Sequence, residues 1–127
     1  MKYEHKFYRC SRCGNLVYFM ESSGVPVICC GKPMAELIPN TVDAAQEKHV
    51  PAAASKEGGK IDVQVGSVPH PMTDEHHIAW IAVAKKDRTI CANLKSGEAP
   101  EAKFCASDEP VTVYAYCNLH GLWSADL

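Results

Sequence analysis

Seven cysteines and six histidines are the side chains of this 127-residue chain best suited to chemistry. Thiolate and imidazole are ligands for zinc, iron and copper, and a thiolate can also take part in redox reactions. Four of the cysteines stand in two pairs within the first thirty residues: Cys10, Cys13, Cys29 and Cys30. A second group is spread over the rest of the chain: His49, His70, His76, Cys117 and His120. The sequence therefore predicts two separate metal sites.

The four N-terminal cysteines suit one tetrahedral ion. Cys10 and Cys13 have the C-x-x-C spacing of a metal-binding knuckle. Cys29 and Cys30 are adjacent, and adjacent residues of a strand point to opposite faces. Both can reach one ion only if the chain turns there, which Gly31 would permit. Spacing alone leaves two ions equally open: zinc, which would be an inert staple, and iron, which would carry an electron.

The second group offers four imidazoles and one thiolate. Five ligands exceed the four that structural zinc normally takes, and imidazole also suits iron, copper and nickel. An octahedral-type ion held by five side chains keeps one position open, where a substrate can bind. His77 follows His76 directly and would point the other way in an extended segment, so we do not expect it to be a ligand.

Other candidate residues have more ordinary interpretations. Cys91 and Cys105 stand in apolar stretches and are predicted to be small buried hydrophobic residues. Trp80 and Trp123 are predicted to belong to the core. His5 is expected to be an ordinary surface or core histidine without a ligand role.

Two parts of the chain with different sequence patterns must position these groups. Residues 1–36 can form almost no hydrophobic core, so we expect a bound metal ion to stabilise this part of the chain. Residues 35–50 are expected to be a linker and loop, with at most a helical turn at 44–48. Strands are predicted at 16–19, 60–65, 78–84, 89–94, 102–106 and 111–117. No clear amphipathic helices separate the later strands, so we predict an all-β fold with an antiparallel sandwich over residues 37–127.

Composition narrows the classes of function. A content of 46% hydrophobic and 22% charged residues is typical of a globular chain. The net charge of −2 argues against nucleic acid and anionic membranes as partners. No apolar run approaches the roughly 18 residues of a membrane span, and the first residues do not read as a signal peptide. We therefore expect a cytoplasmic protein, and a reducing compartment favours metal or redox chemistry over disulfides for its cysteines.

The motifs together resemble one known family. The spacing of the N-terminal cysteines resembles that of desulforedoxin. Three further motifs resemble the iron domain of superoxide reductase: EKHVP at 47–51, HPMTDEH at 70–76 and CNLHGLW at 117–123. Both parts in one chain resemble desulfoferrodoxin, the two-iron superoxide reductase, over nearly the whole length.

The resemblance implies two iron ions per chain. It implies a desulforedoxin-like domain over 1–36 with Fe(Cys)4 at Cys10, Cys13, Cys29 and Cys30. It implies an immunoglobulin-like sandwich over 37–127 with a square-pyramidal iron: His49, His70, His76 and His120 in the plane and Cys117 axial. It also implies that Glu47 and Lys48 act at the open face.

The implied activity is the one-electron reduction of superoxide to hydrogen peroxide. An external donor such as rubredoxin would restore the ferrous ion, and the family implies a homodimer. Whether the N-terminal iron relays electrons or only stabilises the fold is left open.

Two other kinds of function compete with this one. An electron carrier that used only the N-terminal iron would leave the four histidines and Cys117 without a role. A zinc-stapled binding module is the second alternative. Metal analysis separates the three, since two irons per chain support the enzyme, one iron the carrier and zinc the module. A superoxide dismutase is disfavoured, because the family pattern implies reduction only.

Overall fold

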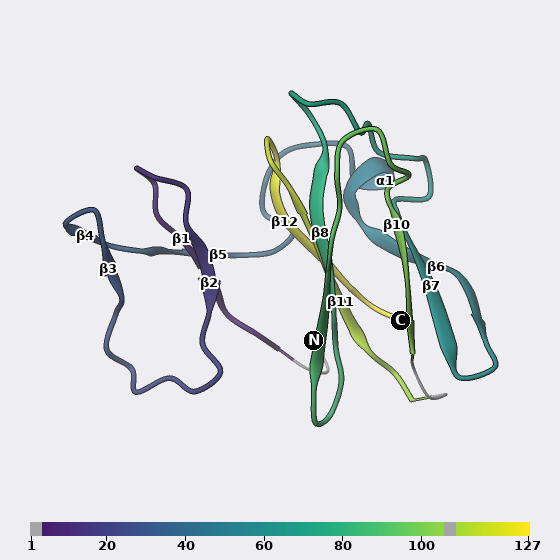
Figure 1. Cartoon of the computed structure of the whole chain (residues 1–127), viewed down its shortest axis with the longest axis horizontal. Coiled ribbons are helices and arrows are strands. Elements are labelled where there is room, and N and C mark those ends of the chain that lie inside the picture. Colours follow the sequence, from purple (N-terminus) through teal and green to yellow (C-terminus); the bar gives the residue numbers. More distant parts are fainter. Residues whose placement is uncertain (1–3, 106–108) are drawn as a thin grey trace. The chain divides into compact units, whose positions relative to one another are not determined.

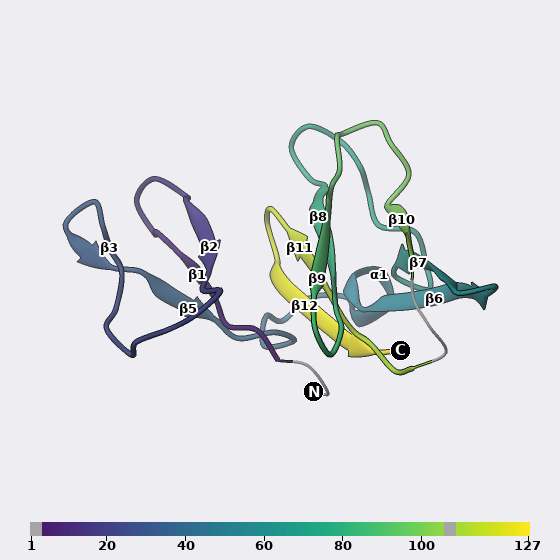
Figure 2. The same cartoon turned by 60° about the horizontal axis from the view of Figure 1, so that its bottom comes forward.

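The computed structural model describes residues 4–105 and 109–127, and these form two compact units. One unit is His5–Ile38, and the other is Pro39–Leu127 together with Glu4. Figures 1 and 2 show the strands of each unit, which we describe separately.

The unit His5–Ile38 is built from five short strands. They are β1 (Phe7–Arg9), β2 (Leu16–Tyr18), β3 (Ile28–Cys29), β4 (Lys32–Pro33) and β5 (Ala35–Leu37). β1 lies between β2 and β5 in an antiparallel sheet, and β3 pairs with β4 as a hairpin. The buried apolar side chains of this unit are Phe7, Cys10 and Met34. So small a core agrees with the expectation that a metal must staple this unit.

The unit Pro39–Leu127 is an antiparallel sandwich. Its elements are α1 (Gln46–His49), β6 (Pro51–Glu57), β7 (Lys60–Val65), β8 (Ile78–Ala84), β9 (Thr89–Asn93), β10 (Glu101–Cys105), β11 (Thr112–Cys117) and β12 (Gly121–Asp126). One sheet has the order β10-β7-β6 and the other β12-β11-β8-β9. The predicted all-β, immunoglobulin-like sandwich is confirmed.

The core of the sandwich lies between its two sheets. Alternate residues of β7 point inward, so that Ile61, Val63 and Val65 are fully buried. They pack with Ile81 of β8 and Val113 of β11 from the facing sheet. This packing fixes the ends of β7, β8 and β11. The connection from β7 to β8 carries His70 and His76, and the end of β11 leads into the turn that carries His120.

Several elements differ from the sequence-based prediction. Residues 35–37 of the expected linker form β5, whereas the helical turn allowed for at 44–48 is present as α1 over 46–49. β1, β3, β4, β6 and β12 were not predicted as strands. β10 spans Glu101–Cys105 and so includes residues 102–105 of the strand expected at 102–106, whose residue 106 lies outside the described part of the chain.

The prediction that Cys91 and Cys105 are buried is wrong. Both side chains are exposed. Each lies on an edge strand, Cys91 on β9 and Cys105 on β10, and in β10 the preceding Phe104 takes the core-facing position. Trp123 is buried as expected, whereas Trp80 is only half-buried and stacks on Tyr116 at 5.7 Å between ring centroids.

Within residues 4–105 and 109–127, no helix is long and apolar enough to span a bilayer.

Candidate metal centres

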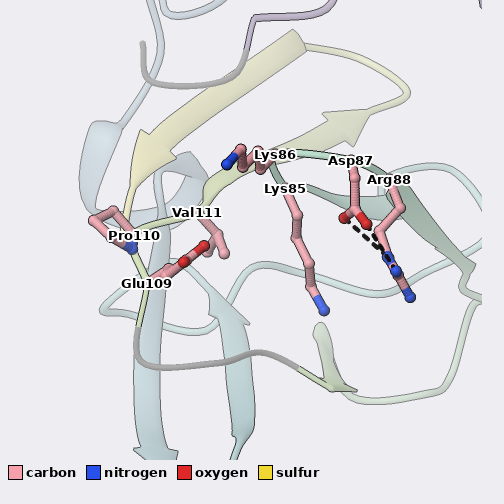
Figure 3. Close-up of a pocket in the computed structure, with 7 residues that line it drawn as sticks. All are labelled: Lys85, Lys86, Asp87, Arg88, Glu109, Pro110 and Val111. Atoms are coloured by element: carbon pink, nitrogen blue, oxygen red, sulfur yellow. Dashed lines mark hydrogen bonds and ion pairs between the residues drawn. The ribbon is translucent and has the colours of Figure 1, made fainter.

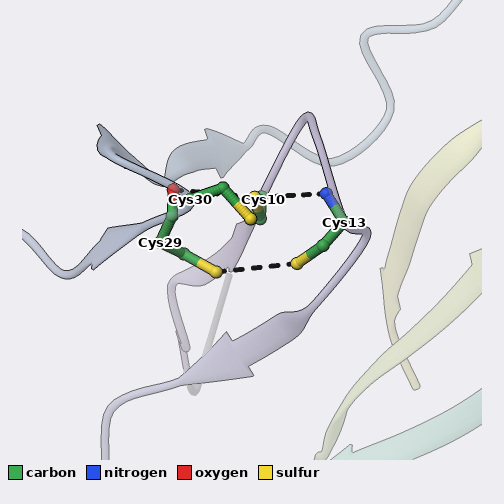
Figure 4. A group of neighbouring side chains, drawn as sticks. All are labelled: Cys10, Cys13, Cys29 and Cys30. Atoms are coloured by element: carbon green, nitrogen blue, oxygen red, sulfur yellow. Dashed lines mark hydrogen bonds between the residues drawn. The ribbon is translucent and has the colours of Figure 1, made fainter.

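The four N-terminal cysteines converge on one point (Figure 4). Their Sγ atoms all lie within 4.8 Å of one another. The Sγ atoms of Cys13 and Cys29 are 3.6 Å apart, and the backbone N–H of Cys13 donates to Sγ of Cys10 over 3.4 Å. Four sulfurs from two turns thus enclose a space that suits one tetrahedral ion.

The turn predicted at Cys29 and Cys30 is present. Cys30 has φ +52° and Gly31 has φ +76°, and these two residues connect β3 to β4. A two-residue hairpin turn of the I′ kind requires positive φ at both positions. The backbone reversal allows two adjacent side chains to face the same ion, which an extended strand would forbid.

The cysteine group cannot hold four negative charges without a cation. Backbone N–H groups of Cys13 and Arg12 lower the pKa of the Cys10 thiol to about 6. The side chains of Cys13 and Cys10 raise the pKa of Cys30 to about 12, and they also raise that of Cys29. The metal-free group therefore keeps its negative charge on Cys10 and its protons on Cys29 and Cys30, and a divalent ion must displace those protons.

We expect metal binding at this group to strengthen steeply as the pH rises. Cys29 and Cys30 are protonated at neutral pH because their pKa values are raised, and each must lose its proton to become a ligand. The release of these two protons alone makes the affinity rise by at least about 100-fold per pH unit near neutrality. Competition for Zn²⁺ with a chelator, corrected for the chelator's own protonation, measures this slope. A rise of less than about tenfold per unit would contradict the proton count.

The second group gathers in the unit Pro39–Leu127. One ligand atom from each of His49, His70, His76 and Cys117 lies within 4.8 Å of all the others. His120 completes the set, because its Nδ1 is 3.1 Å from Nε2 of His49 and 3.9 Å from Sγ of Cys117. The structure therefore brings together all five side chains that the sequence singled out.

The four imidazole rings form a closed square. Neighbouring ring centroids are 4.6 Å apart for His49–His70 and His70–His76, 5.0 Å for His76–His120 and 4.9 Å for His120–His49. The diagonal His49–His76 measures 6.3 Å. Neighbouring rings are steeply inclined, at 73° to 90°, whereas the diagonal pair is inclined by only 33°.

Hydrogen bonds fix which ring nitrogens face the centre of the square. Nδ1–H of His49 donates to the carbonyl of Ala45, and Nδ1–H of His70 donates to that of Pro71, each over 2.7 Å. Both Nε2 atoms are then lone-pair donors to a metal, and they are 3.1 Å apart. Nε2 of His76 is buried and has no hydrogen-bond partner in the described structure.

This arrangement fits one bound metal ion. Two lone pairs that face each other repel unless a cation lies between them, and an unpartnered buried nitrogen is costly. Ligands at right angles, each about 2.1 Å from an ion, stand about 3.0 Å apart, close to the spacing of the facing nitrogens.

Burial favours the neutral form of three of the imidazoles, which is the form that binds a metal. Burial lowers the pKa of His70 to about 4, and it also lowers the pKa of His49 and of His76. Burial raises the pKa of the Cys117 thiol, and the backbone N–H groups of Leu119 and His120 oppose that rise. Those two N–H groups point toward the sulfur and stabilise a thiolate there, with the His120 N–H at 3.4 Å.

The ends of the core strands position the ligands. Cys117 ends β11 and pairs with Ile78 of β8 just after a register shift, so a bulge re-aims the chain beside the site. His120 follows in the turn to β12. His70 and His76 lie in the connection between β7 and β8, and His49 ends α1.

Gly66 sets the position of α1 against the end of β7. A Cβ atom at residue 66 would lie 2.3 Å from the backbone oxygen of Glu47 and 2.9 Å from the backbone carbon of Lys48. Only glycine permits this approach of two backbones. The next segment holds α1 from the same side, because the N–H of Val68 and the hydroxyl of Ser67 both donate to the Glu47 carbonyl.

Glu47 and Lys48 precede His49 on α1. Both side chains are exposed. Their exposure beside a ligand leaves them accessible to an incoming ion in solvent, which is compatible with a role at an open coordination position.

Sequence reasoning missed two residues that support the ligands. The Trp123 ring stacks on His49 with centroids 4.9 Å apart, and its Nε1–H donates to the carbonyl of His120. Trp123 lies in the motif at 117–123, so the motif was a signal that its role exceeds core packing. The other residue is Gly66, and nothing in the sequence signals its close backbone contact.

A separate cavity of about 200 Å³ lies at the hairpin between β8 and β9 (Figure 3). Its charged side chains are partly satisfied locally, because Arg88 pairs with Asp87 at 2.8 Å and Lys85 donates to the carbonyl of Cys105. It lies beyond Ala84, at the opposite end of β8 from Ile78 and the histidines. We therefore exclude this cavity from the candidate metal centres.

Comparison with known proteins identifies the family. The desulfoferrodoxin family model matches residues 41–126, and the model of the desulfoferrodoxin N-terminal domain matches residues 3–37. The chain belongs to the desulfoferrodoxin family. The four-cysteine group and the group of four histidines and one cysteine correspond to the two iron centres of desulfoferrodoxins.

Individual desulfoferrodoxins match over nearly the whole chain. The one from Syntrophotalea carbinolica is 46% identical over 94% of each chain, and the one from Nitratidesulfovibrio vulgaris is 41% identical over 99% of each. Among solved structures, the superoxide reductase from Treponema pallidum superposes with a TM-score of 0.78 at 36% identity, covering 96% of this chain and 98% of its own.

Proposed function

We propose that this chain is a superoxide reductase, which reduces superoxide to hydrogen peroxide with one electron and two protons. The observation that carries the proposal is the square of four imidazoles joined by the Cys117 thiol. Five donors around one ion leave a position for a small ligand. Family membership and the structural likeness to the Treponema pallidum superoxide reductase support the same reaction.

We assign the metal ligands residue by residue. His49, His70, His76, His120 and Cys117 would hold the catalytic iron, and Cys10, Cys13, Cys29 and Cys30 would hold the other iron. A ferrous ion held by these residues would supply the electron, and the Cys117 thiolate would tune its reactivity. The ligand set carries a single negative charge when Cys117 is ionised, so a divalent ion leaves the site net positive and attractive to an anion.

Glu47 and Lys48 of α1 act on the approach of the substrate and on the supply of protons. Lys48 is exposed and directly precedes His49 in the sequence. Its positive charge adds to that of the metal site and steers superoxide toward it. Its Nζ also orders water, which is the source of the two protons. Glu47 acts on the same face, where its carboxylate is a hard oxygen ligand suited to the oxidised ion once the product has left.

Lys48→Ala should slow the bimolecular reaction with superoxide about tenfold and flatten its salt dependence, because the steering charge is lost. Stopped-flow or pulse-radiolysis measurements across ionic strengths test this. Lys60→Ala is the matched control, since Lys60 is an exposed lysine at the other end of β7 from Gly66. An unchanged rate and salt slope in Lys48→Ala would remove the steering role.

The proposed domains are 1–36 and 37–127, each with one iron. The two compact units and the two family matches support a division in this region. We further propose a cytoplasmic homodimer that is re-reduced by a donor such as rubredoxin. Family resemblance supports the dimer and the donor, and the use of five of the seven cysteines as metal ligands agrees with a reducing compartment.

The reaction itself is tested by stoichiometry. A reductase that starts fully reduced should form one hydrogen peroxide for each superoxide consumed, while the catalytic iron loses one electron. A dismutase would form one peroxide for every two superoxide ions, and that result would reject the proposal.

A further inference from the structure

We propose that Asn118 is a positioning residue that places His76 in the ligand square, and this inference rests on the proposed function of the site. Asn118 lies in the turn between the ligands Cys117 and His120. It joins that turn to the segment carrying His76, so that ligands from two loops share one rigid connection.

Three hydrogen bonds make this connection. The backbone N–H of His77 donates to Oδ1 of Asn118 over 2.9 Å. Nδ2–H of Asn118 donates to the carbonyl of Glu75 over 3.0 Å. The backbone N–H of Asn118 donates to the carbonyl of His77 over 3.2 Å. The side chain thus bonds to the residues on both sides of His76 and uses its donor and its acceptor together.

The peptide groups of His76 itself are held from within its own loop. The N–H of His76 donates to Oγ1 of Thr73 over 3.1 Å, and its carbonyl accepts from the N–H of Thr73 over 2.9 Å. Thr73 closes the loop but belongs to it, so Thr73 cannot fix the loop relative to the other ligands. Among the hydrogen-bonded side chains of the described residues, Asn118 is the one that joins this loop to the turn carrying Cys117 and His120.

His76 needs this support because its ring lacks the restraint found on two other ligands. Carbonyl groups orient the rings of His49 and His70 through their Nδ1–H groups. In the described parts of the chain, no carbonyl group plays this part for the ring of His76, and its buried Nε2 is the atom left to face the metal. For most metal-bound histidines an outer partner holds the ring. For His76 the backbone takes over that task, through Asn118.

The test compares Asn118→Ala and Asn118→Asp with the wild type in the full chain loaded with Fe²⁺. Asn118→Ala should weaken Fe²⁺ binding at the histidine site about 10- to 100-fold, measured by competition with a chelator. Hydrogen exchange in the peptide 73–78 should become faster, while the Fe(Cys)4 centre keeps its metal and serves as an internal reference. Asn118→Asp keeps an acceptor for the His77 N–H, so exchange should stay slow there and the affinity should fall between the two.

Asn93→Ala is the matched control. Asn93 is an exposed asparagine at the end of β9, and in the described structure its side chain makes no hydrogen bond. Its replacement should leave both metal centres as they are.

Affinity in Asn118→Ala within twofold of the wild type, or an equal loss in Asn93→Ala, would overturn the inference. If Asn118→Ala fails to fold, Asn118→Asp decides, and wild-type affinity combined with fast exchange in that variant would also overturn it. A wild-type protein that binds Fe²⁺ at the histidine site but does not consume superoxide would reject the proposed function and leave the role of Asn118 testable by affinity.

Discussion

Gly66→Ala should lose the catalytic metal and with it about 100-fold or more of the rate of reaction with superoxide. The added Cβ would lie 2.3 Å from the Glu47 backbone oxygen, and no flexible side chain can yield there because the clash is with backbone. α1 must therefore move, and it carries His49 at its end together with Glu47 and Lys48.

Metal content and single-turnover kinetics measure the effect of Gly66→Ala. The Fe(Cys)4 centre should keep its full occupancy, because the unit His5–Ile38 does not contain Gly66. Gly58→Ala is the control for general loss of stability: Gly58 has φ +61°, but a Cβ there would meet nothing within 4 Å. A Gly66→Ala protein with wild-type iron content and rate would show that the position of α1 does not matter to the site.

Cys13→Ser should remove the N-terminal iron completely and leave the reaction with superoxide within about twofold of the wild type. Cys13 supplies one of four sulfurs, and its backbone N–H contacts a second, so the substitution breaks a tetrahedron that has no spare ligand. The unit His5–Ile38 should lose stability as well, since its own core is only Phe7, Cys10 and Met34.

Iron per chain and single-turnover kinetics of Cys13→Ser separate the two roles open to the N-terminal iron. One iron per chain with a preserved rate means that the two centres work independently. Cys105→Ser, which changes an exposed cysteine outside both groups, should keep two irons. A large loss of rate in Cys13→Ser alone would instead make the N-terminal iron part of electron delivery.

Sequence patterns predicted the parts of the fold in which burial follows a simple period. β8 matches its predicted bounds because its residues are apolar almost throughout, and β7 matches because apolar and polar residues alternate. β6 escaped prediction because its alanines carry little strand preference, and its pairing with β7 makes it a strand. The edge position of Cys91 depends on sheet order, which short-range periodicity does not contain.

The ligand side chains could be found from the sequence because their chemistry is rare and their spacing is recognisable. The contacts that hold them in place could not, even for Asn118, which lies within the motif at 117–123. Gly66 acts through the absence of a side chain. Asn118 acts through side-chain hydrogen bonds to His77 and Glu75, which lie 41 and 43 positions earlier in the sequence. Such contacts exist only once the strand ends have been brought together.

The ligand shell of the catalytic iron, measured by X-ray absorption at the iron edge of Cys13→Ser, tests the account most directly. That variant should hold only the iron at the histidine site, so no signal from the Fe(Cys)4 centre overlaps. We expect four nitrogen ligands and one sulfur ligand, as the converging side chains offer. A shell without sulfur, or with fewer than four nitrogens from histidine, would contradict it.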